Sequence, residues 1–272
     1  MIKEYPFSQV FGIFYVGAAN YGLDTEKSDV DTRVLIVPTL KDLVYNTKPI
    51  SKTIIRENGE HIEVRDIRLA LQNFKKQNPN SLEILFTKYK IINKKYQGFW
   101  EVLTHYAEDI CYLNPEVAIK CIQGMSIQKF RELERISKTR EDIVKTYLYD
   151  PKELYHLLRL EEFLARYVKK EEPYESCLRS KKATFLQDLK RNKNLPTLDE
   201  ARQMAEIAMS NINHISETTN PREITSTIEV YRADNALNGI QYNIIESSLF
   251  AEILERKGVL APKVVGKYSD LN

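Results

Sequence analysis

The chain has 272 residues, 43% of them hydrophobic, and a formal net charge of +2. This length is enough for one large or two modest domains with a buried core, and the small net charge does not by itself indicate a nucleic-acid-binding protein. No apolar run reaches the roughly 18 residues of a membrane helix, and the first residues lack a signal-peptide pattern. The three cysteines lack the spacing of a zinc site and are predicted to be packing residues: Cys111, Cys121 and Cys177. We therefore expect a cytoplasmic protein without a membrane segment.

The first part of the chain alternates short apolar runs with helical patterns. Their periodicity predicts strands at 10–16, 30–37, 52–56 and 60–65, and helices at 66–77 and 79–88. Asn58 and Gly59 have the sequence of a tight antiparallel turn between the third and fourth strands. That hairpin is expected to bring the fourth strand beside the second.

From about Trp100 onward the pattern is almost entirely helical. Helices are predicted at 98–112, 115–137, 140–148, 151–169, in a lysine-rich piece at 175–191, and at 197–213 and 239–257. The stretch 216–238 is polar, and we interpret it as a loop or short strands. The sequence thus predicts an α+β fold, with a small mixed-sheet domain at 1–95 and a mostly α-helical domain at 96–272 that closes over a cleft.

The most informative segment lies between the first two predicted strands. Small residues from Gly17 to Gly22 allow a close turn whose backbone N–H groups could meet phosphate oxygens. Asp29 and Asp31 follow, and on a strand their spacing places both carboxylates on one face. Because Mg²⁺ takes one or two carboxylates plus substrate phosphate oxygens, the segment predicts a metal–nucleotide site.

These residues form the pattern G-[S/A]-x-x-Y-G-x-x-T-x-x-S-D-x-D-x-R, here Gly17, Ala18, Tyr21, Gly22, Thr25, Ser28, Asp29, Asp31 and Arg33. The pattern resembles that of the DNA polymerase beta-like nucleotidyltransferase superfamily, in particular its predicted bacterial and phage nucleotidyltransferases. The resemblance implies a palm-like sheet domain, Mg²⁺ or Mn²⁺ as the cofactor, and a nucleoside triphosphate substrate, with ATP expected. It also implies that Gly17, Ala18, Tyr21 and Ser28 bind the nucleotide.

The superfamily carries a third carboxylate on a neighbouring strand. Glu63 alternates with Ile62 and Val64 and is our choice for this catalytic and metal-binding role beside Asp29 and Asp31. The alternative is Asp66, but the register set by the motif residues that follow favours Glu63; these are Asn78, Pro79, Glu83 and Leu85.

The segment 149–160 resembles a helix of the same family, so that the resemblance covers roughly the first 160 residues. Its Lys152, His156 and Arg159 share one helix face because they are spaced by four and three residues. The resemblance implies that this face contacts the nucleotide, whereas without it the same three residues would be interpreted as a solvated stripe.

Several residues keep a second interpretation. The usual serine after the first glycine of the motif is Ala18 here, so one hydroxyl for a nucleotide phosphate is absent. Tyr21 could stack on a base or be a buried tyrosine with a bonded hydroxyl. Three other histidines have no partner in the pattern and are predicted to be structural or surface residues: His61, His105 and His214.

The predicted activity is metal-dependent transfer of a nucleoside monophosphate to an acceptor hydroxyl. Lysine-rich clusters in the helical part, such as Lys181 and Lys182, favour an RNA end as acceptor over a protein or a small molecule. Two alternatives remain: a catalytically silent nucleotide-binding sensor, for which Ala18 is the argument, and a nucleic-acid-binding module that uses the basic helices. The sequence gives no indication of the oligomeric state.

Overall fold

A computed structural model of the chain describes residues 5–25, 28, 30–57, 60–137 and 140–257. Its sheet has five strands in the order β3-β4-β2-β1-β5. They are β1 (Val10–Val16), β2 (Asp31–Ile36), β3 (Ser51–Ile55), β4 (His61–Asp66) and β5 (Lys90–Ile92). β2 and β4 run parallel, and the other neighbouring pairs run antiparallel. The predicted mixed sheet is therefore confirmed, and β5 is a strand that the sequence pattern did not reveal.

The register of β2 decides which residues share a face of this sheet. Asp31 pairs with Val16 of β1, and Arg33 pairs with Glu63 of β4. Because partners in register point to the same side, Asp31, Arg33 and Glu63 lie on the face of Val16, which belongs to the main hydrophobic core under the helices. The opposite face carries a separate small cluster made of Val10, Val34, Ile36, Ile62 and Val64.

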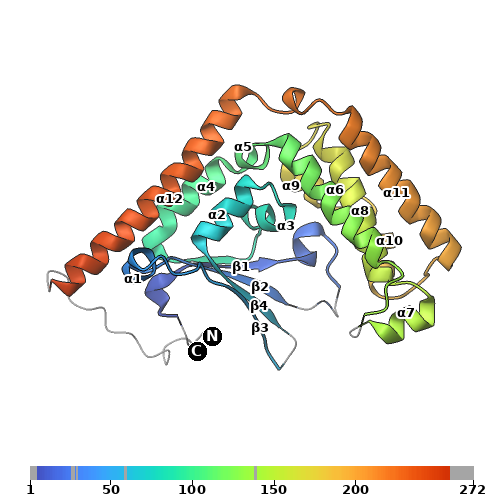
Figure 1. Cartoon of the computed structure of the whole chain (residues 1–272), viewed down its shortest axis with the longest axis horizontal. Coiled ribbons are helices and arrows are strands. Elements are labelled where there is room, and N and C mark those ends of the chain that lie inside the picture. The colour runs from blue at the N-terminus through green and yellow to red at the C-terminus, as the bar shows by residue number, and fades with distance from the viewer. Residues whose placement is uncertain (1–4, 26–27, 29, 58–59, 138–139, 258–272) are drawn as a thin grey trace.

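The helices of the first half lie over the sheet, those from α6 to α11 continue away from it, and α12 returns alongside the first group (Figure 1). The first group is α1 (Leu40–Val44), α2 (Ile67–Lys75), α3 (Pro79–Leu82), α4 (Gln97–His105) and α5 (Ala107–Cys111). The second is α6 (Pro115–Glu132), α7 (Glu141–Tyr147), α8 (Pro151–Tyr167), α9 (Tyr174–Leu178), α10 (Ala183–Lys190), α11 (Leu198–Thr218) and α12 (Thr227–Arg256). α8 packs against α6, α10 and α11, and α12 packs against α2, α4 and α5.

The interpretation of 216–238 as a loop or short strands is wrong. α11 extends to Thr218, and α12 begins at Thr227. Ala233, Leu237, Ile240 and Ile244 are buried at spacings of three and four residues, which is the pattern of one helix face. Two of the first buried positions are alanines, Ala233 and Ala236, so the apolar face is inconspicuous in a polar segment.

Other predicted elements are interrupted where the chain turns. The helix predicted at 79–88 is α3 followed by a 3₁₀ turn (Glu83–Leu85), and the piece at 98–112 divides into α4 and α5. The lysine-rich piece divides into α9 and α10. The Asn58-Gly59 turn lies outside the described residues, but the flanking β3 and β4 pair antiparallel as expected.

One hydrophobic cluster connects the sheet to both groups of helices, from Phe11 of β1 to Ile244 of α12. Cys111 and Cys177 are buried within it, and all three cysteines are free, as expected for packing residues. The division of the chain near residue 95 stays a prediction. Within the described ranges, no helix combines the length and the apolar character needed to cross a membrane.

Candidate functional site

The turn after β1 has a backbone that only glycine adopts easily. Gly17 has φ 87° and ψ −139°, a 3₁₀ helix covers Ala18–Tyr21, and Gly22 closes the turn in the left-handed conformation. A Cβ atom at Gly17 would lie 3.1 Å from the Oδ2 atom of Asp31. The turn and the first residue of β2 are thus in close contact, which places the Asp31 carboxylate directly at the turn.

Most N–H groups of this turn are already engaged. Gly17 donates to the Oε2 atom of Glu83 at 3.0 Å, and Asn20, Gly22 and Leu23 donate to carbonyl oxygens of the turn itself. Of the N–H groups predicted to meet phosphate, those of Ala18 and Ala19 therefore remain the candidates within the described turn. These two open the 3₁₀ helix, so their N–H groups have no acceptor within it.

Glu83 is the buried carboxylate that fixes the turn. From the sequence it served only to set the register of the preceding strand. Its Oε2 atom also accepts a hydrogen bond from the side-chain amide of Asn20 at 2.8 Å. Burial raises the pKa of Glu83, and the bonds from Asn20 and Gly17, together with nearby Arg33 and Arg159, act in the opposite direction. Its place five residues after Asn78, in the segment that follows the third carboxylate, was the available signal.

Asn80 joins the turn to α8. Its Oδ1 atom accepts hydrogen bonds from the Tyr21 hydroxyl at 3.1 Å and from Arg159 at 3.4 Å. The Arg159 guanidinium also lies over the Tyr21 ring, 4.0 Å from its centroid. Tyr21 is thus the buried tyrosine with a bonded hydroxyl that the sequence left as an alternative, and its contact with a nucleotide stays a prediction.

Glu63 lies on the same sheet face as Asp31 and is held by two arginines. Arg33 donates from Nε to Glu63 at 2.6 Å and from Nη1 to the Asn80 carbonyl at 2.8 Å. Arg65 forms a second ion pair with Glu63. A metal ion that binds Glu63 must therefore compete with these guanidinium groups, and neither arginine had been assigned this role from the sequence.

Two further carboxylates were considered as metal ligands, Asp29 and Asp66. Asp29 lies outside the described residues. Asp66 lies three residues after Glu63 and pairs in register with Ile36, so it is on the opposite face of the sheet from Glu63. It caps α2 and pairs with Arg68 at 2.7 Å. Among the described residues, which leave out Asp29, no three His, Cys, Asp or Glu side chains converge on a metal position.

Cations from three helices surround His156 of α8. Burial lowers its pKa well below the usual value, and the charges of Arg159, Lys129, Lys152 and Lys190 lower it further. Lys190 of α10 donates to the Ser28 hydroxyl at 2.8 Å, and Ser28 directly precedes Asp29 in the chain. The structure therefore brings the predicted helix residues and the aspartate segment to one region. The other histidines, His61, His105 and His214, are exposed, as expected.

A mixed sheet that places an aspartate strand directly against a glycine turn, with helical cations beside it, defines a polymerase beta-like nucleotidyltransferase. The chain belongs to the RNA repair pathway DNA polymerase beta family, whose family model matches residues 3–223. The match includes the turn, both described carboxylates and α8, and it ends before α12. The comparison with curated proteins gave no match.

Proposed function

We propose that this protein transfers a nucleoside monophosphate from a nucleoside triphosphate, with ATP as the expected donor, to a hydroxyl at an RNA end. The observation that carries the proposal is the contact of Asp31 with the Gly17 turn at the place where Lys190 reaches Ser28. A triphosphate has anionic oxygens for both partners, since lysines bind phosphate directly and carboxylates bind it through a divalent cation. The family belongs to an RNA repair pathway, which favours RNA as the acceptor.

The donor set fits a hard cation such as Mg²⁺ or Mn²⁺. Asp29, Asp31 and Glu63 offer only carboxylate oxygens, the ligands that these ions prefer. Bound there, such an ion would lower the pKa of the acceptor hydroxyl and neutralise charge on the triphosphate. Because Arg33 also donates to the Asn80 carbonyl, it could release Glu63 to a metal ion and still be held in place by this second hydrogen bond.

The protein's own residues supply positioning. Glu83 keeps the turn in one conformation through Gly17 and Asn20, so the N–H groups of Ala18 and Ala19 point in fixed directions. The depressed pKa keeps His156 neutral at pH 7, which leaves the positive charge of this region to arginine and lysine. Fixed charges and fixed donors are the main source of rate acceleration in phosphoryl transfer.

A catalytically silent nucleotide sensor is the second candidate, because Ala18 lacks the usual serine hydroxyl. A hydrogen bond to a charged group contributes about 1.5–3 kcal/mol. Ala18→Ser should therefore tighten triphosphate binding or leave it unchanged. The three candidate carboxylates in the sequence, Asp29, Asp31 and Glu63, argue for catalysis, since a protein that only binds a nucleotide would gain nothing from the mutual repulsion of such groups around one nucleotide.

The test is transfer of label from each nucleoside triphosphate to defined RNAs in Mg²⁺ or Mn²⁺. Oligoribonucleotides with a free 3′ hydroxyl are compared with oligoribonucleotides whose 3′ end is blocked by phosphate, and a cell extract supplies protein and small-molecule acceptors in parallel. We expect metal-dependent label on RNA that Asp31→Asn abolishes. Label that appears only on protein or on a small molecule would refute the RNA acceptor, and absence of any transfer with intact triphosphate binding would favour the sensor.

A further inference from the structure

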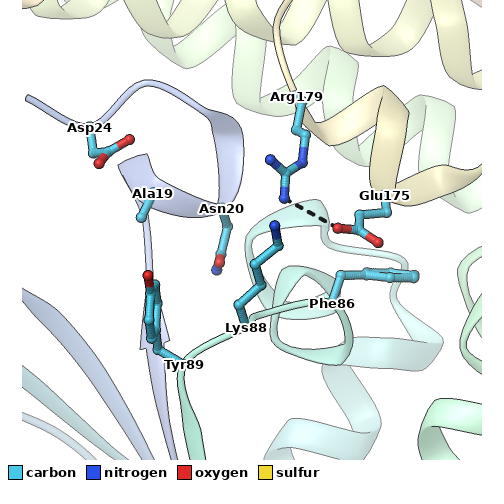
Figure 2. A pocket seen from close by; sticks show the side chains of 8 residues that line it. All are labelled: Ala19, Asn20, Asp24, Phe86, Lys88, Tyr89, Glu175 and Arg179. Carbon is cyan, nitrogen blue, oxygen red and sulfur yellow. Dashed lines mark hydrogen bonds and ion pairs between the residues drawn. The ribbon is translucent and has the colours of Figure 1, made fainter.

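A cavity of about 190 Å³ adjoins the turn (Figure 2). Ala19 and Asn20 of the 3₁₀ helix form one wall, and Phe86 and Tyr89, which flank the start of β5, form others. Lys88 extends between Asn20 and Phe86 toward the guanidinium of Arg179 (Figure 2). Apart from the turn residues Ala19 and Asn20, none of the lining residues was assigned a role from the sequence, and the cavity lies next to the turn without including Asp31 or Glu63.

The aromatic residues of the cavity differ in their freedom to stack. Phe86 is already stacked on Tyr174, with ring centroids 5.5 Å apart. Tyr89 is 71% exposed, and its ring is met edge-on by Tyr15 at 6.2 Å and 83°. Because Tyr89 is mostly exposed and has this one ring contact among the described residues, most of its ring is accessible to a planar ligand.

The cations of the cavity are fixed to different degrees. Arg166 donates to the carbonyls of Arg179 and Ser176 and so anchors the end of α9, while the Arg179 side chain pairs with Glu175 at 3.2 Å. Lys88 forms no ion pair with any residue that the structure describes. Two cations that line one cavity repel each other, and an anion between them removes that repulsion.

The charge of the lining limits what this anion can be. Asp24 and Glu175 also line the cavity and offset the two cations. A triphosphate tail carries several negative charges and would be repelled by these carboxylates, whereas a nucleotide within a strand carries one. The combination of an exposed aromatic ring and two cations is suited to one unit of a single-stranded nucleic acid, whose base can stack and whose single phosphate can be bound.

The backbone that carries Tyr89 lies two strands away from Asp31. β2 and β5 flank β1 on opposite sides, with Asp31 paired to Val16 and the Tyr89 carbonyl bonded to the Tyr15 N–H at 3.0 Å. Neighbouring strands are about 4.8 Å apart, so the backbones of Asp31 and Tyr89 are separated by on the order of 10 Å. Burial raises the pKa of Tyr15, and the nearby charges of Asp24 and Asp31 raise it further.

We propose that this cavity holds one nucleotide of a single-stranded RNA acceptor, with its base against Tyr89 and its phosphate between Lys88 and Arg179. The assignment rests on the proposed nucleotidyl transfer to RNA, and it names the surface that holds the strand near the site of transfer. It differs from the lysine clusters of the helical part, because here cations and an open aromatic ring occur together.

The test measures binding of a fluorescent single-stranded oligoribonucleotide to the full chain by anisotropy, without nucleotide or metal, across a salt series. We expect Tyr89→Ala to weaken binding about 10-fold, the effect of one lost base stack, with an unchanged salt dependence. Lys88→Gln should lower the slope of log affinity against log salt by about 0.7, the value for one single-strand phosphate. Tyr45→Ala is the matched control, since Tyr45 is 72% exposed and lies away from the cavity on α1.

Titration of each variant with nucleoside triphosphate and Mg²⁺ gives the second readout, in which we expect wild-type affinity. Wild-type RNA binding by both Tyr89→Ala and Lys88→Gln would overturn the proposal, as would loss of triphosphate affinity in these variants, which would assign the cavity to the donor nucleotide. RNA binding is measured without turnover. If the variants bind RNA like the wild type while the wild type transfers label to RNA, only the assignment of the cavity is refuted. If the variants bind RNA more weakly but the wild type transfers no label, only the proposed function is refuted.

Discussion

The cations of the helical part fall into two sets with different partners. On the side that faces the turn, Arg159 is buried, lies over Tyr21 and donates to Asn80, and it forms no ion pair with a described residue. On the outer side, Lys181 pairs with Glu172 at 3.3 Å and Lys182 pairs with Glu161 at 3.7 Å. Both sets are rich in lysine and arginine in the sequence, and only the structure separates them.

The two sets differ in whether their positive charge is already paired with a carboxylate at the surface. Exposed ion pairs such as those of Lys181 and Lys182 contribute little and need no further partner. A buried guanidinium loses hydration and requires compensation. Arg159 obtains part of it from Glu83, whose oxygen is shared with Gly17 and Asn20. Arg159 therefore can still bind an anion, whereas Lys181 and Lys182 already pair with carboxylates.

The largest expected effect follows from removing the carboxylate that complements the inner cations. Asp31→Asn keeps the side-chain volume and removes one charge, so we expect transfer to fall about 100-fold or more, the scale of losing one group that stabilises charge in the transition state. Steady-state turnover with Mg²⁺ measures it. Asp66→Asn is the matched control, because Asp66 caps α2 and asparagine also caps helices. Equal losses in both variants would contradict the assignment.

Glu83→Ala should have the next largest effect. It leaves the Gly17 N–H and the Asn20 amide without their acceptor, and each unsatisfied buried group costs about 1–3 kcal/mol. We expect the free energy of unfolding to fall by about 2–5 kcal/mol in urea, with weaker triphosphate binding. Glu83→Gln retains one acceptor oxygen and should lose less stability than Glu83→Ala. Equal losses in the two variants would show that the charge, rather than the hydrogen bonds, holds the turn.

His156 predicts a pH dependence of stability. Its pKa is lowered in the folded state, so below about pH 6.5 the unfolded chain takes up a proton that the folded chain does not, and stability falls with falling pH. The loss is at most about 1.4 kcal/mol per pH unit, and partial exposure reduces it. The charged groups that oppose protonation are Lys152 and Arg159 on α8, Lys129 on α6 and Lys190 on α10.

Urea denaturation of wild type and His156→Gln between pH 7.5 and 5.5 measures this contribution. We expect the stability of the wild type to decline more than that of the variant by about 1 kcal/mol. Added triphosphate should reduce the difference, because a bound anion favours the protonated imidazole. Parallel pH profiles for the two proteins would show that His156 does not couple protonation to folding.

The smallest effect is expected on the outer set. The sequence predicted that Lys181→Glu with Lys182→Glu weakens the use of an RNA acceptor. The ion pairs with Glu172 and Glu161 instead indicate a change in RNA affinity of less than about 1 kcal/mol at physiological salt. Anisotropy with the same oligoribonucleotide measures it. A reduction in salt slope of about 1.4, which equals two phosphate contacts, would restore these lysines to the acceptor surface.

Local patterns predicted those parts of the fold that depend on periodicity. β1 occupies the predicted residues 10–16, and the alternation around Glu63 places this residue on the face of Asp31 as expected. α12 was recognised only in its second half, because its first buried positions are alanines within a polar segment. β5 has three residues and gains its hydrogen bonds from β1, so no local pattern could reveal it.

The residue types of the candidate site can be recognised in the sequence, but the hydrogen bonds and ion pairs between them cannot. The spacing of Asp29 and Asp31 predicts a metal-binding role that stays a prediction, and Asp29 lies outside the described residues. The roles of Glu83, Asn80 and Arg33 arise from contacts between residues 30 to 79 positions apart in the chain. Such pairs carry no spacing rule, and therefore a single sequence could show these residues without showing what they hold.

Asn80 has a mechanical consequence for the protein. Its carbonyl accepts from Arg33 of β2, and its side chain accepts from both Tyr21 of the turn and Arg159 of α8. Ser180, at the end of α9, donates its N–H to the Tyr21 carbonyl as well. The strand, the turn and α8 are thus connected through one residue. Any displacement of α8 relative to the sheet would therefore strain the hydrogen bonds that position the turn.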